Sequence, residues 1–493
     1  MRSFNLIDWR GIITEYTYNS FGKVLTQKSY KEGEANNYRL TEYTYDSDGI
    51  QMLSETDPRY YHNGVALIRE YEYDNRGRGL VTNMIDFNGQ EYINDYDSKT
   101  DEQTTLSSED NDSGVTLQNN FSYTRGYLTK LTHNNFNFGF TFDSLGREKS
   151  VSVENEILFN KSYSKSNTTE TLTTIYASGE ESVLITDSLG NPTTRTYKGV
   201  YDVIPRAIFN AKYDAAGNLT EYIDNETGIC YNYTYDKHGN VTEVLEKDSA
   251  TGATLRTNTY VYDSEAHNKV LSTTYGATGQ KYIPIYEKNS AGDYYPDDAV
   301  IGVELETKQG NGYSIKYKVE TQKDDLGRIH NNFIKLGNSN TSLLLQKYTY
   351  LKNEYPYASG KYITTDFVAS VEDQICGEAD KTTVYTYDKS GNIETVSEDN
   401  VLIAKYYYDK WNRLVREDNH KFAKTYTWSY DIGGNILEKR IYTLCTGELD
   451  SYYESKVYAY ETTGNRDRMA CYNNESCAYD SYSSEEIFSE DLE

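Results

Sequence analysis

The stretch Val384-Tyr-Thr-Tyr-Asp-Lys-Ser-Gly-Asn-Ile-Glu-Thr-Val396 decides the fold. Its first half alternates tyrosine with threonine or valine, the period of two that is typical of a strand with one buried face. Asp388 suits the first position of a type I turn, because its carboxylate can accept hydrogen bonds from amides two or three residues on. Gly391 falls where the turn needs a positive φ, which glycine adopts without a Cβ clash. Alternation and turn chemistry together predict a β-hairpin.

The same unit recurs along most of the chain. The copies share an Asp, two variable residues and a Gly, and the best of them continue with Asn or Arg and an aliphatic residue. One copy has Asn in the glycine place, where Asn is the next best residue. The predicted structural turn residues are Asp46, Gly49, Asp74, Gly77, Asp143, Gly146, Asp187, Gly190, Asp214, Gly217, Asp236, Gly239, Asp388, Gly391, Asp409, Asn412, Asp431 and Gly434.

The spacing of the copies predicts the fold class. Asp214 and Asp236 are 22 residues apart, and Asp388 and Asp409 are 21 apart. A period of 21–22 has room for two strands of about 7–9 residues and two turns, and none for a crossover helix. We therefore expect an all-β protein of repetitive antiparallel hairpins. The right-handed twist of strands would make such an array curl into a spiral or barrel-like shell, which also protects strand edges.

Composition favours a partly solvated sheet over a compact globule. The chain has 52 Tyr, against 14 Phe and 3 Trp, and only 37% of its 493 residues are hydrophobic. Tyrosine is apolar in its body and polar at its tip, so it suits a surface that is half wet. A large curved sheet with two half-solvated faces fits these numbers.

Charge and hydropathy exclude several classes of partner. The net charge of −27 and the pI near 4.7 argue against nucleic acid and anionic membranes. The negative charge either forms an acidic inner or outer wall of the sheet, or simply keeps a large sheet soluble. No stretch approaches the ~20 apolar residues of a membrane span, so no membrane insertion is expected. The first residues lack the apolar region of a signal peptide.

No catalytic, metal or cofactor site is predicted. One Asp per turn is too few for the six to eight oxygen ligands of Ca²⁺, and the six His are scattered without paired spacing. No nucleophile elbow or phosphate-binding loop occurs, and no carboxylate pair stands out as a glycosidase pair. Trp9, Trp411, Trp428 and exposed Tyr could stack on sugars, although strand packing accounts for most of them.

The repeat array defines the expected domain organisation. Residues 1–480 form one shell segment. Within it, 97–114 reads as an acidic surface connection with one poor strand in its middle, and 277–313 as an irregular insertion, although 301–307 alternates like a strand. Residues 481–493 are rich in Ser and Glu and read as a disordered tail.

The copies resemble the RHS or YD repeat, Tyr-Asp-x-x-Gly-Asn/Arg-Leu/Ile/Val, as found in Rhs proteins, Tc-toxin shells and teneurins. Recognisable copies run from Tyr16 to Asp480. The resemblance implies a hollow cocoon. It also implies a non-catalytic structural shell segment of a secreted Rhs-like polymorphic toxin, enclosing a toxin carried elsewhere and keeping it unfolded.

The implied partners are the rest of the shell and a C-terminal toxin domain in a longer homologue, and the implied location is secreted or attached to the cell wall. The alternative is a cell-surface module that binds carbohydrate. After Tyr479-Asp480 the closing Gly-Asn-Pro of the family is absent. We therefore expect a truncated, open shell that self-associates.

Overall fold

The computed structural model describes residues 2–62, 65–110, 115–133, 135–154, 156–265, 268–289, 291–310, 312–337, 339, 342–461 and 468–472. These residues form strands and turns and no helix. The strands are β1 (Arg2–Ile7), β2 (Ile12–Tyr18), β3 (Val24–Lys31), β4 (Asn37–Tyr45), β5 (Met52–His62), β6 (Val65–Tyr73), β7 (Val81–Ile85), β8 (Glu91–Tyr96), β9 (Gln103–Asp110), β10 (Val115–Thr124), β11 (Tyr127–His133), β12 (Phe136–Phe142), β13 (Glu148–Val153), β14 (Glu156–Lys165), β15 (Thr169–Tyr176), β16 (Glu181–Asp187), β17 (Pro192–Lys198), β18 (Arg206–Tyr213), β19 (Leu219–Asp224), β20 (Ile229–Tyr235), β21 (Val241–Asp248), β22 (Thr254–Tyr262), β23 (Val270–Tyr275), β24 (Gln280–Tyr286), β25 (Val300–Gln309), β26 (Gly312–Lys323), β27 (Ile329–Leu336), β28 (Ser342–Glu354), β29 (Tyr362–Ile375), β30 (Lys381–Tyr387), β31 (Ile393–Glu398), β32 (Val401–Tyr408), β33 (Leu414–Asn419), β34 (Lys424–Tyr430), β35 (Ile436–Thr443), β36 (Glu454–Tyr460) and β37 (Met469–Tyr472).

The topology is one antiparallel meander. Each strand pairs with the next one in the chain, from the β1–β2 hairpin to the β36–β37 hairpin. All nine predicted Asp-x-x-Gly turns join an even-numbered strand to the following odd-numbered one. Because neighbouring strands run in opposite directions, these turns all lie on one edge of the sheet. We call this edge the turn rim and the other edge the opposite rim. The prediction of an all-β hairpin array is confirmed.

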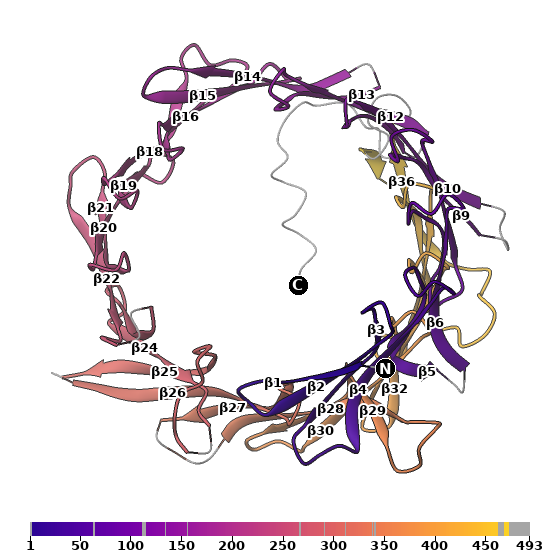
Figure 1. The fold of residues 1–493 in the computed structure, drawn as a ribbon. Coiled ribbons are helices and arrows are strands. Elements are labelled where there is room, and N and C mark those ends of the chain that lie inside the picture. Colours follow the sequence, from indigo (N-terminus) through magenta and orange to yellow (C-terminus); the bar gives the residue numbers. More distant parts are fainter. Residues whose placement is uncertain are drawn as a thin grey trace.

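The sheet closes on itself at a seam between β4 and β29. The two strands pair in parallel, with Asn37 opposite Tyr362 and Tyr38 opposite Ile363. Counted inclusively from β4 to β29, 26 strands form the closed ring. Figure 1 shows the ring from one end, with an open interior. The wall is therefore not the open shell that the sequence led us to expect, since main-chain pairing joins its two ends.

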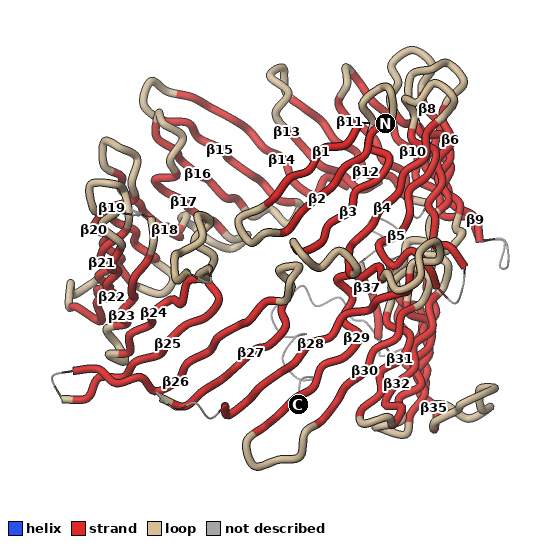
Figure 2. Tube along the Cα trace, turned by 60° about the horizontal axis from the view of Figure 1, so that its bottom comes forward, coloured by secondary structure: helices blue, strands red, loops and turns tan. Residues whose placement is uncertain are grey.

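The ring continues beyond the seam as a spiral. The first three strands overlap the ring near β24–β29, and the strands after β29 overlap it near β5–β10 (Figures 1 and 2). The pairing of β29 explains the branching. Its first residues pair with β4, whereas Ser370–Asp373 pair with β30. One long strand therefore serves two layers.

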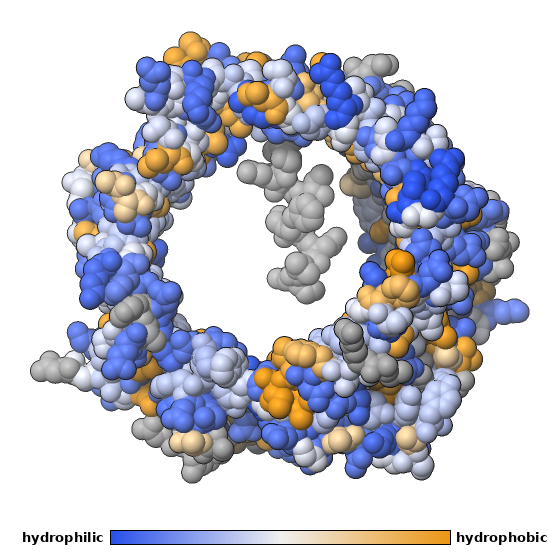
Figure 3. Space-filling view, viewed as in Figure 1, coloured by the Kyte–Doolittle hydropathy of each residue, from blue (hydrophilic) through white to orange (hydrophobic). Residues whose placement is uncertain are grey.

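The described part of the chain has a small apolar core, which lies at the seam. Tyr38, Leu40 and Ile363 are buried there, and Tyr30, Tyr61 and Tyr355 pack against them. Elsewhere most side chains of the wall are half-buried, and Figure 3 shows polar and apolar residues interspersed around the hollow ring. A wall with two half-solvated faces was expected from the abundance of tyrosine.

The two irregular segments contain more sheet than the sequence suggested. Within 97–114, β9 pairs on both sides, with β8 and with β10. Within 277–313, β24 pairs with β25 and β25 with β26, so the departure from the hairpin pattern is confined to residues 287–299. The segment 481–493 lies outside the described residues.

Candidate functional site: the repeat turn, the seam and the lumen

The turn after β30 shows how each repeat reverses the chain. The amide of Asp388 donates to the carbonyl of Asn392 at 2.9 Å, and the amide of Gly391 donates to the carbonyl of Asp388 at 3.2 Å. Gly391 has a φ of 93°, in the left-handed region that only glycine and asparagine adopt readily. The ladder register shifts between Thr386 and Tyr387, a β-bulge of the kind that accompanies such turns.

The same geometry occurs at every predicted turn. The nine residues in the glycine place have φ between 62° and 94°, and the nine Asp amides each donate to a carbonyl across the turn. The nine in the glycine place are Gly49, Gly77, Gly146, Gly190, Gly217, Gly239, Gly391, Asn412 and Gly434. The turns of Asp46 and Asp74 are longer, with the acceptor at Gln51 and Leu80.

The Asp carboxylate organises the turn with both of its oxygens. In the turn after β18, Oδ1 of Asp214 accepts from the amides of Ala216 and Asn218, both at 2.9 Å. The second amide is thus four residues on, one more than we had expected. Oδ2 accepts from the side-chain amide of Asn218 at 2.9 Å. The hydrogen bond from the Asn218 side chain, followed by the one from its backbone amide, holds the pKa of Asp214 below its usual value.

This second bond explains why the repeat accepts either Asn or Arg after the glycine. In the turn after β12, the guanidinium of Arg147 donates to Oδ2 of Asp143 at 2.8 Å. Both side chains present an N–H group to the same carboxylate oxygen.

The tyrosine that precedes the Asp has a role that we did not predict. The hydroxyl of Tyr235 donates to the carbonyl of Leu219 at 2.6 Å, and Leu219 is the first residue of the strand that follows the preceding turn. Each such hydroxyl ties one hairpin to the hairpin before it. Tyrosines of other even-numbered strands make the same bond, whether or not an Asp follows them: Tyr45 to Val24, Tyr73 to Met52, Tyr96 to Val81, Tyr163 to Glu148, Tyr213 to Pro192, Tyr262 to Val241, Tyr286 to Val270, Tyr350 to Ile329, Tyr408 to Ile393, Tyr430 to Leu414 and Tyr460 to Ile436.

A sequence signal for this bond exists. The separation between the tyrosine and its acceptor is 15, 16 or 21 residues in nearly all copies, for example 16 between Tyr235 and Leu219 and 21 between Tyr262 and Val241. The spread reflects whether the intervening hairpin carries extra residues.

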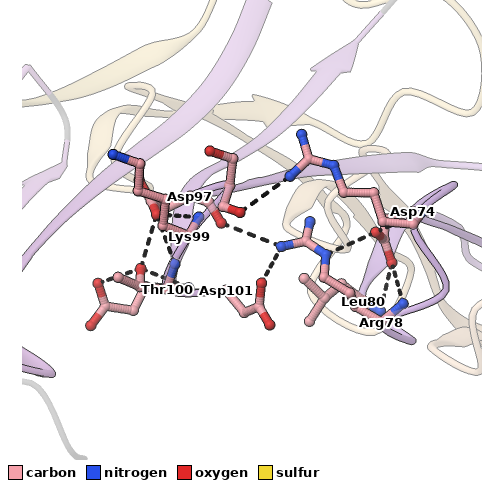
Figure 4. A network of polar contacts seen from close by, with 10 residues as sticks. Asp74, Arg78, Leu80, Asp97, Lys99, Thr100 and Asp101 are labelled. Carbon is pink, nitrogen blue, oxygen red and sulfur yellow. Dashed lines mark hydrogen bonds and ion pairs between the residues drawn. The ribbon is translucent and has the colours of Figure 1, made fainter.

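Adjacent turns on the turn rim are linked by arginine. Arg78 contacts Asp74 of its own turn at 3.0 Å and also forms an ion pair with Asp101 of the next turn on the rim (Figure 4). Arg413 repeats the pattern, because its guanidinium donates to the carbonyl of Asp431 in the next turn at 3.0 Å.

The layers of the spiral meet through the turn rim. Arg59 of β5 is buried, pairs with Asp57 at 2.7 Å, and donates to the carbonyls of Asp388 and Lys389. Its guanidinium also lies 5.0 Å from the centre of the Phe367 ring. A second contact joins the turn after β32 to the end of β9: the indole of Trp411 donates to Oγ of Ser108 at 3.2 Å. No pattern in the sequence predicts these two contacts.

The N-terminal layer is fastened in the same way. Arg10, in the turn after β1, pairs with Glu287 and Asp297 at 2.8 Å each. Both partners lie in the irregular segment between β24 and β25, so that segment anchors the first hairpin.

A cavity of about 460 Å³ lies between the first layer and β28. Tyr348 and Tyr350 of β28 line it, together with Glu34, Asp325 and His330. Of the three tryptophans, Trp9 is exposed, whereas Trp411 is engaged with Ser108.

Within the described residues, no group of three or more His, Cys, Asp or Glu is placed to hold a metal ion. The same residues contain no helix that is long and apolar enough to cross a membrane.

Comparison with known proteins identifies the repeat. The model of the RHS Repeat family matches residues 213–251, which contain the turns of Asp214 and Asp236. No curated protein sequence matches the chain. The match confirms the interpretation of the two copies in this stretch as RHS, or YD, repeats.

Solved structures share the fold. The structure of TcdB2-TccC3 without its hypervariable C-terminal region superposes with a TM-score of 0.55 at 13% sequence identity. The alignment covers 93% of this chain and 26% of the TcdB2-TccC3 chain. TcdB2-TccC3-Cdc42 has a TM-score of 0.53 at 14% identity, covering 92% and 26%. The Tc holotoxin pore of Photorhabdus luminescens, a TccC3 variant, has a TM-score of 0.51 at 14% identity, covering 91% and 26%. This chain thus spans about a quarter of the solved chains that it matches.

Proposed function

We propose that this RHS-repeat protein is a non-catalytic shell segment of a secreted Rhs-like toxin, and that its ring encloses toxin polypeptide. The closed, hollow ring is the observation that carries the proposal (Figures 1 and 3). Shared fold with TcdB2-TccC3 and with a Tc holotoxin supports it. The partners would be the rest of a shell and a toxin segment, outside the cell or at its wall.

The size of the ring suits a polypeptide cargo. With 26 strands in the ring, a strand spacing of about 4.8 Å and a tilt of about 40° give a wall about 50 Å across. Side chains reduce the free width to about 40 Å. A compact domain of about 100 residues has a radius of gyration of about 13 Å, or about 34 Å across, so one small domain or an unfolded segment would fit.

Enclosure would act by exclusion and not by bond-making. A protease of about 220 residues is about 44 Å across by the same relation, which is wider than the free lumen. Main-chain hydrogen bonds hold each strand of the wall to its neighbours, so an enclosed segment would be reached only through the ends of the ring.

The test appends a reporter domain of about 100 residues to the C-terminus and measures how fast trypsin degrades it. We expect degradation to be several-fold slower than for the free reporter. Ile363→Asp, which places a charge in the buried seam, should abolish the protection. Ile375→Asp is the matched control, because Ile375 lies in the same strand but is exposed. Equal degradation in all three proteins would contradict the proposal.

A second candidate function is carbohydrate binding, and the cavity beside β28 favours it. Two tyrosine rings next to a histidine and two carboxylates offer stacking surfaces and hydrogen-bonding groups for a saccharide. A glycan array separates the two functions. Binding that Tyr348→Ala removes, and that Tyr275→Ala at an exposed site leaves intact, would support the carbohydrate function. If the array shows no bound glycan, the carbohydrate function is excluded and enclosure stays as the proposed function.

A further inference from the structure

Three turns of the chain carry leucine at the same position of the repeat, and they differ sharply in exposure. The third residue of the Asp-x-Leu-Gly turn is Leu145 after β12, Leu189 after β16 and Leu326 after β26. Leu145 is 74% exposed and Leu189 is 72% exposed, whereas Leu326 is 8% exposed. The local structure is the same, so the difference lies in what covers the turn.

The first layer of the spiral covers Leu326. A Cβ placed on the neighbouring Gly327 would lie 3.7 Å from Cδ1 of Ile12, at the start of β2. Ile12 lies on the opposite rim of its layer, beside the turn that joins β1 to β2. The turn rim of one layer therefore packs on the opposite rim of the other.

The same rule holds at the other end of the chain. The turn at Asp388 packs against Arg59, and Trp411 packs against Ser108. Arg59 and Ser108 lie near the ends of β5 and β9 that form the opposite rim. Contact between a turn rim and an opposite rim is thus the established interface of this molecule, seen three times.

The arc of the ring from β13 to β18 has no second layer in the described residues (Figures 1 and 2). Exposed apolar side chains lie at both rims of this arc. The turn rim presents Leu145 and Leu189. The opposite rim presents the loop between β17 and β18, where Tyr201 is 85%, Val203 91% and Ile204 76% exposed. Leu189 and this loop flank the two ends of the same strand, β17.

We propose that a second copy of this chain stacks end-on at this arc, with its opposite rim on the turn rim of the first copy. The apolar loop of one copy would cover Leu145 and Leu189 of the other, as the first layer covers Leu326. Such a contact joins two different surfaces and does not close, so further copies can add along the ring axis.

The dependence of association on salt distinguishes this apolar contact from an electrostatic one. Each copy has a net charge of −27, so copies repel one another at low ionic strength. Added salt screens that repulsion, and apolar contact is not weakened by it. Association should therefore increase with salt.

Sedimentation velocity of the full chain, over about 1–100 µM, tests the proposal. The wild type should form dimers and longer species as the concentration rises. Leu145→Lys/Leu189→Lys on the turn rim, and Val203→Lys/Ile204→Lys on the opposite rim, should each weaken association at least about tenfold, because large apolar side chains are lost from the contact. Lysine lowers the net negative charge, so relief of repulsion would have the opposite effect.

Mixing provides the decisive control. Each double variant keeps one intact rim, so an equal mixture of the two should form 1:1 dimers and no longer species. Val319→Lys, at an exposed position in the middle of β26, should associate like the wild type. The proposal is overturned if the wild type stays monomeric or if the mixture does not dimerise. It is also overturned if Val319→Lys weakens association as much as the two double variants do.

Discussion

Arg59 donates a hydrogen bond from its guanidinium to the carbonyl of Lys389, a residue 330 positions later in the chain. Its side chain is 2% exposed and that of its ion-pair partner Asp57 is 7% exposed. The pair therefore fastens the last layers of the spiral to the ring at a site without access to water.

We expect Arg59→Ala to destabilise the contact between the layers by about 3–5 kcal/mol, because removing one member of a buried pair leaves an uncompensated charge. Hydrogen exchange of the hairpin around Lys389 measures the loss. Arg206→Ala is the control, since its pair with Glu226 is largely exposed and should contribute at most about 1 kcal/mol. Comparable effects of the two variants would show that Arg59 is not the fastening residue.

Tyr235→Phe should destabilise its hairpin by about 0.5–1.5 kcal/mol, because the carbonyl of Leu219 loses its hydrogen-bond donor while packing is retained. Exchange of the amides in β20 and β21 reports the change. Tyr201→Phe, at an exposed position, should change nothing measurable. A neutral Tyr235→Phe would mean that water replaces the hydroxyl at no cost.

Gly391→Val and Gly217→Val separate backbone strain from steric overlap. Both residues have a positive φ, 93° and 88°, which should cost a β-branched residue about 1–3 kcal/mol. A Cβ on Gly391 would also lie 3.1 Å from the Phe367 ring, whereas one on Gly217 meets nothing within 4 Å. In urea denaturation, we expect Gly391→Val to lower the free energy of unfolding by at least about 1 kcal/mol more than Gly217→Val does. Lys389→Ala, in the same turn as Gly391, should change it by under about 0.5 kcal/mol. Equal effects of the two glycine variants would exclude the overlap.

Stability should fall at alkaline pH. Burial raises the pKa of Tyr213, Tyr235 and Tyr262, and raises that of Tyr38 at the seam to about 12. The unfolded chain loses these protons at pH about 10, so above that pH it binds fewer protons than the folded chain. The urea midpoint should therefore hold below pH 10 and decline as the pH rises through the raised values. Phenols that ionise near pH 10 without a change in the midpoint would contradict the burial described here.

Stability should also fall in acid. The side-chain amides of Asn191, Asn218 and Asn240 hydrogen-bond Asp187, Asp214 and Asp236, and hold the pKa of each carboxyl below its usual value. A lowered pKa stabilises the folded state above about pH 4, and the stabilisation is lost as the pH falls through the folded value. Replacing all three Asn with Ala should flatten the acid dependence, as measured by stability between pH 5 and 2. An unchanged profile would show that these bonds do not set it.

The sequence predicts the turn better than the wall because the turn is local. Asp388 and Gly391 act within five residues, so their chemistry is visible in the chain itself. The acceptor of the Tyr235 hydroxyl depends on the register of two hairpins, which alternation alone leaves undetermined. Arg59 has no pattern around it, since its partners Asp388 and Lys389 come near only after the ring has closed. The closure at Ile363 was implied by the family resemblance and not by any residue pattern.

The seam also dictates when the molecule can be completed during synthesis. Tyr38 and Ile363 are opposite each other in the ring, yet the ribosome, adding about 5–20 residues per second, needs about 15–65 s to travel from one to the other. Throughout that interval the edge of β4 that will receive β29 has no partner, and unpaired edges attract other strands. Slower translation, or a shortage of chaperones that shield nascent chains, should lower the yield of this protein more than that of a chain whose contacts are all local.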